Sequence, residues 1–150
     1  MNSINIKFKK INSGAKLPTR GTNASAGYDL YACITDDVVI DPRTTKLIPL
    51  GFATAIPEGY FGAVYARSGL ATKQGLRPAN CVAVIDTDYR GEWMVPLFND
   101  SNTSRVIQNG DRIAQVVIQE CISANFAVVE ELDETDRGSG GFGSTGINTK

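Results

Sequence analysis

The 150-residue sequence contains no histidine at all. Without imidazole there is no Ser-His-Asp triad, no Cys-His pair and no His-ligated zinc site, so several common classes of hydrolase are excluded. A general base that works near neutral pH must then be a carboxylate, a lysine, a tyrosine or a thiolate. Any acid–base chemistry in this chain depends on one of those groups.

Cysteine is also scarce, with three residues, Cys33, Cys81 and Cys121, lying far apart in the sequence. There is no CxxC pair and no zinc-knuckle spacing. Their apolar neighbours predict small, buried side chains. The odd count, together with an N-terminus that lacks the apolar block of a signal peptide, fits a reducing compartment. We therefore expect a cytoplasmic protein, or a nuclear one in a eukaryotic or viral setting.

The sequence also lacks an excess of charge of either sign and has no long apolar run. The chain carries 15 Lys and Arg against 16 Asp and Glu, which gives a net charge of −1. Such a balance provides no general attraction to nucleic acid or to an anionic membrane. No run approaches the ~18 apolar residues of a membrane span. We expect neither a nucleic-acid nor a membrane partner, and any phosphate binding requires a local site.

Long amphipathic helical patterns are absent, whereas short apolar runs rich in Val, Ile, Tyr and Phe are frequent and separated by turn residues. This pattern predicts an all-β sandwich or barrel in one domain. One short helix is expected over residues 68–74, ended by Gly75. The expected strands lie at 4–8, 28–34, 38–40, 47–50, 52–56, 60–66, 81–85, 93–98, 113–118 and 126–129.

The C-terminal end differs from the rest, because residues 138–146 contain five glycines in nine positions. We predict a barrel domain over residues 1–136 and a flexible Gly-rich arm over 137–150. A disordered tail is the plain alternative. Against it stand Arg137 before the segment and Phe142 within it, and the backbone N–H groups with the Ser144 and Thr145 hydroxyls suit an anion.

Residues 84–93 suggest a β-hairpin whose polar turn carries candidate chemistry. Asp86 ends an apolar strand, where a partly desolvated carboxylate suits a general base. Asp88 occupies the turn, and Gly91 is expected to allow a positive φ. An ordinary hairpin with turn aspartates is the alternative.

Three further segments hold polar side chains next to predicted strands. Arg67 and Ser68 begin the short helix, whose free N–H groups suit a phosphate, although an N-cap and a surface ion pair explain them equally well. Asp29 either holds a metal-bound water or caps backbone amides. Gln115 is a core amide or a phosphate donor, and Asp111 and Arg112 are expected to form a structural ion pair.

The order and combination of these segments are more specific than any one of them. ASAGYDLYA, ARSGLATKQG, NCVAVIDTDYRGE, GDRIAQ and RGSGGFGSTG follow one another between residues 24 and 146. The set closely resembles the five motifs of the homotrimeric dUTPases. That resemblance implies a jelly-roll-like β-barrel and a homotrimer whose active sites draw on all three chains. It further implies Mg²⁺-assisted hydrolysis of dUTP to dUMP and pyrophosphate, which keeps uracil out of DNA and supplies dUMP for dTMP synthesis.

The resemblance also implies residue roles, with Asp86 as the carboxylate that activates the attacking water. Asp29 is expected to act through water near Mg²⁺. The residues expected to contact the base and sugar are Asn80, Val84, Ile85, Tyr89, Met94 and Phe142. Those expected to contact the phosphates are Arg67, Ser68, Gly69, Gln115, Arg137, Gly143, Ser144 and Thr145.

Two positions depart from the family pattern: Ala66 stands where many members have proline, and Ala83 where many have glycine.

Two alternative functions are considered. A dCTP deaminase, or a bifunctional deaminase–dUTPase, is the nearest enzymatic alternative, and a non-catalytic regulator on the same fold is the alternative from another class. Asp86, the hairpin motif and the C-terminal arm favour a dUTPase.

Overall fold

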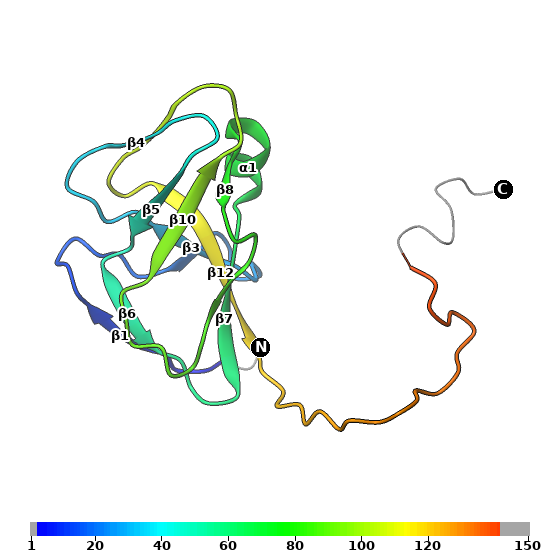
Figure 1. Ribbon diagram of the computed structural model, residues 1–150. Helices are drawn as coiled ribbons and strands as arrows, with labels where there is room; N and C mark the ends of the chain where they lie inside the picture. Colours follow the sequence, from blue (N-terminus) through cyan, green and yellow to red (C-terminus); the bar gives the residue numbers. More distant parts are fainter. Residues whose placement is uncertain (1–2, 142–150) are drawn as a thin grey trace.

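Short β-strands make up most of the regular structure in the computed structural model, which describes residues 3–141 (Figure 1). The helix α1, Ser68–Gln74, lies between β7 and β8. In chain order the strands are β1 Lys7–Lys10, β2 Thr19–Arg20, β3 Tyr28–Tyr31, β4 Val38–Ile40, β5 Thr45–Pro49, β6 Phe52–Ala55, β7 Tyr60–Tyr65, β8 Leu76–Pro78, β9 Ala83–Ile85, β10 Met94–Asn99, β11 Arg105–Ile107 and β12 Arg112–Glu120.

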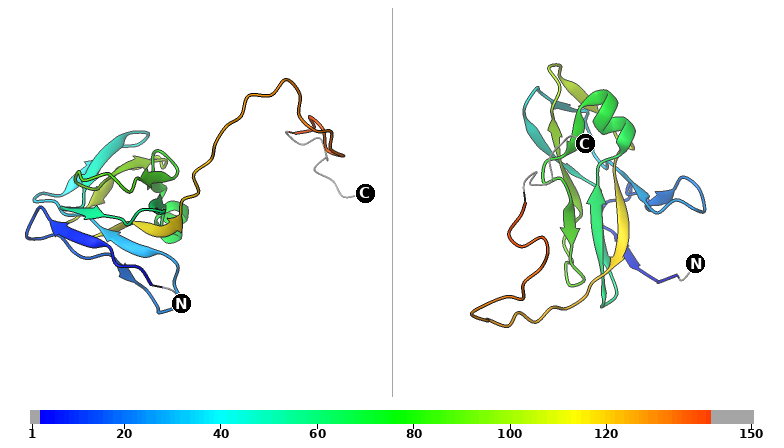
Figure 2. Two further views of the ribbon diagram at one scale, coloured as in Figure 1. Left: turned by 90° about the horizontal axis from the view of Figure 1, so that it is seen from below. Right: turned by 90° about the vertical axis from the view of Figure 1, so that its right-hand side faces the viewer.

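The strands pair antiparallel in four sheets that wrap around a common core (Figures 1 and 2). The largest sheet has the order β2-β3-β12-β7-β9, and a three-stranded sheet has the order β5-β10-β8. The pairs β1-β6 and β11-β4 complete the barrel. This arrangement confirms the predicted jelly-roll-like β-barrel with one short helix.

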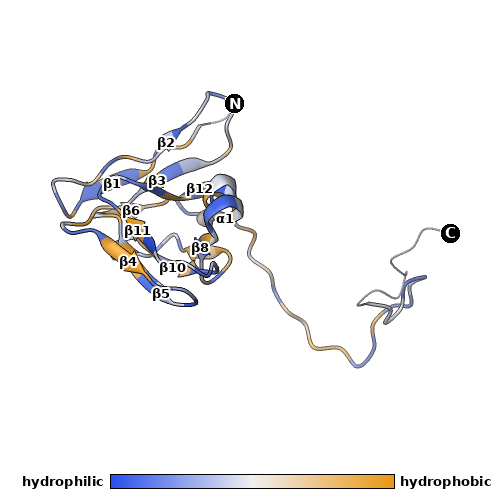
Figure 3. Ribbon diagram, turned by 90° about the horizontal axis from the view of Figure 1, so that it is seen from above, coloured by the Kyte–Doolittle hydropathy of each residue, from blue (hydrophilic) through white to orange (hydrophobic). Residues whose placement is uncertain are grey.

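The core consists of apolar side chains. Along β10 they alternate with less buried residues, whereas β6 and β7 each bury three consecutive residues. Leu30, Ile40, Ile48 and Leu97 are fully buried. The aromatic rings of Phe52 and Trp93 pack with centroids 5.3 Å apart. Figure 3 shows β4 as a markedly hydrophobic strand, and its outward Val39 pairs directly with Val106 of β11.

The predicted strand at residues 126–129 is wrong for the single chain. Residues 121–141 contain neither helix nor strand and run away from the barrel (Figure 2). Phe126 is 96% exposed there. A lone extended segment leaves its backbone groups without strand partners, so β-propensity by itself does not form a strand. The predicted domain boundary at 136 lies sixteen residues after the end of β12 at Glu120 and stays a prediction.

The predicted hairpin over residues 84–93 is also wrong. β9 pairs with β7, whereas β10 pairs with β5 and β8, so the intervening loop crosses from one sheet to another. The buried Trp93, packed on Phe52, draws the end of the loop into the core. Gly91 does not have a positive φ. It is needed for a different reason, because a Cβ at Gly91 would lie 2.6 Å from Cζ of Tyr89.

The helix α1 has the predicted bounds and the predicted end. Gly75 adopts φ 70° and donates its N–H to the carbonyl oxygens of Ala71 and Leu70. Arg67 occupies the N-cap position without a side-chain cap, so the alternative in which Ser68 caps the helix is wrong. No helix in the described part of the chain is long and apolar enough to cross a membrane.

The cysteine prediction is confirmed for one residue and wrong for two. Cys33 is buried against the turn at Gly51, whereas Cys81 and Cys121 are exposed. All three thiols are free. Cys81 and Cys121 lie in a turn and just beyond the last strand, where apolar sequence neighbours do not ensure burial.

Candidate active site

The residues predicted to contact the base and sugar and to activate the attacking water line one pocket of about 220 Å³, apart from Phe142, which falls outside the described residues. They come from segments that the fold brings together: the turn after β8, the strand β9, the loop that follows it, and the start of β10. The lining residues are Asn80, Ala83, Val84, Ile85, Asp86, Tyr89, Glu92 and Met94. Ala83 was noted only as a departure and Glu92 was missed, because a glutamate in a loop carries no distinctive sequence signal.

Asp86 lies directly after β9 and is exposed in the single chain. This corrects the expectation of a partly desolvated carboxylate, because the described residues of one chain leave the pocket open on that side. The carbonyl of Asp86 accepts the N–H of Tyr89 at 3.2 Å, which forms a tight turn. A water molecule and a substrate can therefore reach the Asp86 carboxylate from solvent.

The loop that carries Asp86 and Tyr89 is held by side-chain hydrogen bonds. The Thr87 hydroxyl donates to the carbonyl of Ile56 at 2.9 Å, which ties the loop to the segment after β6. Nη1 of Arg90 donates to the carbonyl oxygens of Thr87 and Tyr89 at 2.7 and 3.0 Å. These bonds make the turn around Asp86 a defined structure.

The far end of the same loop is anchored to the turn between β5 and β6. A carboxylate oxygen of Glu92 accepts the N–H of Gly51 at 2.9 Å. The Tyr89 hydroxyl donates to the carbonyl of Glu92 at 2.9 Å, so the tyrosine ring folds back over the loop. Because a Cβ on Gly91 would meet that ring, glycine at position 91 sets the place of Tyr89.

A second polar cluster forms where β3, β12 and β7 lie side by side. Gln115 of β12 pairs in register with Asp29 of β3 and with Tyr65 of β7. Nε of Arg67, two residues after β7, donates to Asp29 Oδ1 at 2.7 Å, and Arg112 Nη1 donates to Asp29 Oδ2 at 3.1 Å. Asp29 is the most buried of the three charged groups, with 15% side-chain exposure. The predicted ion pair of Arg112 with Asp111 is wrong, since Asp29 is its partner.

The amide of Gln115 supports the turn that holds Arg67. Its Nε2 donates to the carbonyl of Ala66 at 2.9 Å. Gly27 leaves the space for this amide, because a Cβ on Gly27 would lie 3.1 Å from Cδ of Gln115. The cluster therefore combines two guanidinium groups, one carboxylate and one amide at the start of α1.

The two clusters are not joined within one chain. Arg67, Ser68, Gly69 and Gln115 do not line the pocket that holds Asp86. Ile85, just before Asp86, pairs with Gly62 of β7. Arg67 follows five residues later, so at ~3.3 Å per residue the two sites lie ~16 Å apart along the strand. One chain presents half of the predicted site at each end of β7.

The arm is described only as far as Gly141. Arg137 donates from Nε to the carbonyl of Gly140 at 2.9 Å, within a turn that Thr135 and Gly138 close. This turn lies away from both clusters in the single chain (Figure 1). The predicted contacts of Phe142, Gly143, Ser144 and Thr145 fall outside the described residues.

A protein cage for a metal is not found among residues 3–141, where no three His, Cys, Asp or Glu residues group together. Asp29 was predicted to face Mg²⁺ through water. Each of its oxygens already accepts one guanidinium N–H. A carboxylate has about four lone-pair sites, so lone pairs remain for a metal-bound water. The residues fit a metal whose direct ligands are substrate oxygens rather than side chains.

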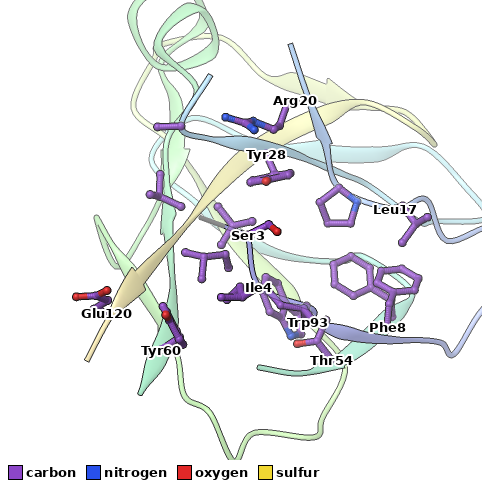
Figure 4. A pocket seen from close by; sticks show the side chains of 17 residues that line it. Ser3, Ile4, Phe8, Leu17, Arg20, Tyr28, Thr54, Tyr60, Trp93 and Glu120 are labelled. Atoms are coloured by element: carbon purple, nitrogen blue, oxygen red, sulfur yellow. The ribbon is translucent and has the colours of Figure 1, made fainter. Parts of the chain in front are cut away.

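A larger cavity of about 650 Å³ lies elsewhere, beside β1 and β12, and its lining is mostly apolar (Figure 4). Phe8, Tyr28, Tyr60 and Trp93 contribute rings to it. It holds no Asp, and its charged lining residues are Arg20 and Glu120. Despite its size, its chemistry suits an apolar segment better than a nucleotide.

Comparison with known proteins is consistent with this geometry. The family model described as dUTPase matches residues 13–146. The chain belongs to the dUTPase family. The deoxyuridine 5′-triphosphate nucleotidohydrolase of Syntrophotalea carbinolica is 47% identical over 98% of this chain and 100% of its own length. The enzyme of the same name from Oryza sativa subsp. japonica is 45% identical over 95% of this chain and 81% of its own length.

A solved structure supports the fold of this dUTPase-family chain. The dUTPase of Staphylococcus bacteriophage 80alpha, determined with dUpNHpp, has a TM-score of 0.87 and 28% identity. The match covers 97% of this chain and 100% of the phage chain. The jelly-roll-like barrel of the family is thus confirmed by structure as well as by sequence.

Proposed function

We propose that this chain hydrolyses dUTP to dUMP and pyrophosphate, as a dUTP diphosphatase, with Asp86 as the general base. The observation that carries the proposal is the convergence of Asn80, Tyr89 and Asp86 on one small pocket. A water molecule attacks the α-phosphorus in line and transfers a proton to the Asp86 carboxylate. The bond from that phosphorus to the bridging oxygen breaks, and pyrophosphate leaves with the electron pair.

The base and sugar occupy the pocket through different groups. The amide of Asn80 offers both a donor and an acceptor, which suits the imide edge of uracil. Backbone groups of Val84, Ile85 and Met94 hold the rest of the base, and Phe142 stacks on it. Tyr89 packs under the deoxyribose and leaves no room for a 2′-hydroxyl. Cytosine places a donor where uracil has an acceptor, and an unpaired buried polar group discriminates strongly.

The phosphates lie against the second cluster and the arm. Arg67, Ser68, Gly69 and Gln115 provide donors at the start of α1, and Arg137 with Gly143, Ser144 and Thr145 closes over the chain of phosphates. Mg²⁺, when bound, neutralises charge on the phosphate oxygens, with Asp29 beside it through water. The protein groups orient the α-phosphorus toward the water at Asp86.

The active enzyme is a homotrimer with shared active sites. Asp86 and Arg67 lie at opposite ends of β7, so the Asp86 pocket of one copy needs the Arg67 cluster of another. The exposed apolar side chains between β12 and the arm support assembly too. Ile122, Phe126 and Val128 are 89%, 96% and 102% exposed in the single chain. The apolar cavity of a neighbouring copy provides a cover for this segment, 121–129 (Figure 4).

The test is pyrophosphate release from dUTP with Mg²⁺, in parallel with dCTP, dTTP and UTP. We expect release from dUTP alone. Asp86→Asn should lower turnover by about 10²–10⁴-fold, the usual contribution of a positioned base. Asp88→Asn is the matched control, because Asp88 lies in the same turn but does not line the pocket. Equal activity of Asp86→Asn and the control would refute the role of Asp86.

Two alternatives have distinct outcomes in the same assay. Release of ammonia from dCTP would make the chain a deaminase or a bifunctional enzyme. Binding of dUTP by a folded trimer without pyrophosphate release would make it a regulatory relative that kept the nucleotide site.

A further inference from the structure

The two arginines around Asp29 differ in what they can offer a phosphate. Arg67 donates Nε to Asp29 at 2.7 Å and Nη1 to the carbonyl of Arg112 at 3.3 Å. Within the described residues its Nη2 has no hydrogen-bond partner, and Arg67 is 28% exposed. The guanidinium is therefore held along one edge while its other N–H groups stay available. Arg112 faces the opposite oxygen of Asp29 and is 52% exposed.

An irregularity in β12 brings Arg112 to this place. The register of β12 with β3 shifts between Arg112 and Ala114. In a regular strand, residues 112 and 115 would point to opposite faces, because side chains alternate. The shift pairs Arg112 with Tyr31 and Gln115 with Asp29, and these two β3 residues share a face. A β-bulge can re-aim a side chain in this way, and bulges are frequent beside active sites.

The net charge of Asp29, Arg67 and Arg112 suits the binding of an anion. A carboxylate beside a phosphate site repels the ligand, and Asp29 with Arg67 alone would sum to zero charge. Arg112 compensates Asp29, so that the three groups together keep one positive charge. An ion pair with a half-exposed partner contributes little to folding stability. We therefore expect Arg112 to contribute to ligand affinity rather than to the free energy of unfolding.

We propose that Arg112 is a positioning residue for triphosphate binding and that it acts through Asp29. Arg112 neutralises the Asp29 carboxylate and fixes its position. Asp29 in turn holds the Arg67 guanidinium so that its outer N–H groups face the phosphates. This inference rests on the proposed function. It goes beyond it by assigning a role to Arg112, which no site prediction included.

A double-mutant cycle tests the proposal by the binding of dUpNHpp with Mg²⁺. Arg112→Gln should weaken binding about tenfold when Asp29 is present, and less than about threefold in an Asp29→Asn background, because coupled residues are not additive. Arg112→Lys, which keeps the charge, should retain most of the affinity. Equal losses from Arg112→Gln in both backgrounds would mean that Arg112 does not act through Asp29, and would overturn the proposal.

Two probes separate this inference from the proposed function. Binding of deoxyuridine, which has no phosphates, should be unchanged in Arg112→Gln; a matching loss would indicate a general structural effect and refute the proposal. The affinities for inorganic tripolyphosphate should show the same coupling between Arg112→Gln and Asp29→Asn as those for dUpNHpp, because tripolyphosphate does not need the base pocket. If wild type binds tripolyphosphate with this coupling but neither binds nor hydrolyses dUTP, the proposed function fails while the inference stands.

Arg105 provides a matched control for the loss of one positive charge. Arg105→Gln removes the same charge near α1, but Arg105 bonds to the carbonyl of Gln74 at the other end of the helix. Its dUpNHpp affinity should equal that of wild type. In steady state, Arg112→Gln should raise KM for dUTP about tenfold and change kcat less than threefold, since it alters ground-state phosphate binding. A fall in kcat without a change in KM would contradict the proposed role.

Discussion

Single residues at the pocket act through the space they leave as well as through the groups they carry. Gly91 has no special backbone conformation, yet a Cβ there would lie 2.6 Å from Cζ of Tyr89. The tyrosine hydroxyl in turn donates to the carbonyl of Glu92. The missing side chain of Gly91 therefore sets where the Tyr89 ring lies under the proposed sugar site.

We expect Gly91→Ala to displace the Tyr89 ring and to relax the rejection of UTP. The ratio of kcat/KM for dUTP to that for UTP should fall about tenfold, which corresponds to ~1.4 kcal/mol of lost discrimination. The measurement is steady-state pyrophosphate release from both nucleotides. Gly21→Ala, where a Cβ would make only an ordinary contact with Ser25 at 3.7 Å, should leave the ratio unchanged. An unchanged ratio in Gly91→Ala would contradict the prediction that Gly91 sets the position of the Tyr89 ring.

At the scale of the element, Arg67, Ser68 and Gly69 lie together because α1 starts three residues after the end of β7, with Arg67 as its N-cap, and it stops after seven residues. The stop depends on Gly75, whose φ of 70° lies in the left-handed region. A Cβ at Gly75 would also lie 3.0 Å from the backbone N of Ser101. Both factors make glycine the residue that allows the chain to turn from α1 into β8.

Gly75→Ala should destabilise the protein by about 1–2 kcal/mol, the usual cost of a left-handed L-residue. Gly69→Ala is the opposed control: it lies inside α1 with nothing near its added Cβ. That substitution should stabilise the fold by less than ~1 kcal/mol, which is the cost of glycine relative to alanine in the middle of a helix, because Gly69 lies in the first turn of α1. Urea unfolding of both variants measures the difference. A Gly75→Ala variant as stable as wild type would contradict the assignment.

At the scale of the whole molecule, one chain by itself keeps the two halves of the proposed site apart. Its two clusters lie at opposite ends of β7, and its segment 121–129 exposes apolar side chains to solvent. Association of three copies resolves both features in the proposed trimer. The same association would cover the open side of the pocket at Asp86.

Light scattering should give the mass of a trimer for the full chain. The double substitution of Phe126→Asp with Val128→Asp should shift the mass toward monomer at micromolar concentration, because buried charge opposes docking of segment 121–129. Leu132→Asp, three residues beyond that segment, is the control and should remain trimeric. A trimer that tolerates both aspartates would place the assembly contact elsewhere on the barrel.

Truncation after Asp136 tests the arm separately from assembly. The shortened chain keeps segment 121–129 and should remain a trimer, but it should lose roughly a hundredfold in dUTP turnover, because Arg137 and the residues beyond it no longer enclose the phosphates. Full activity in the truncated trimer would return residues 137–150 to the role of a plain tail.

Sequence reasoning was most successful where local pattern decides structure. The bounds of α1 and its glycine end follow from residue types a few positions apart. Most of the strands follow from apolar runs. The strands β2, β8 and β11 do not, because each of these short segments contains an arginine and therefore forms no uninterrupted apolar run. The strand at 126–129 was wrong because a strand needs a partner that a single chain does not provide.

By itself, the sequence determined an all-β chain, the order of its five motifs, and a base that is not histidine. These are properties of residue types and short spacings. Only the tertiary structure decided that the segment around Asp86 is a loop between two sheets, and that Arg112 pairs with Asp29 rather than with its neighbour Asp111. Both depend on strand pairing between distant residues. The ion pair of Arg112 with Asp29 also depends on a register shift between strands whose residues lie over eighty positions apart, and no local pattern encodes such a register.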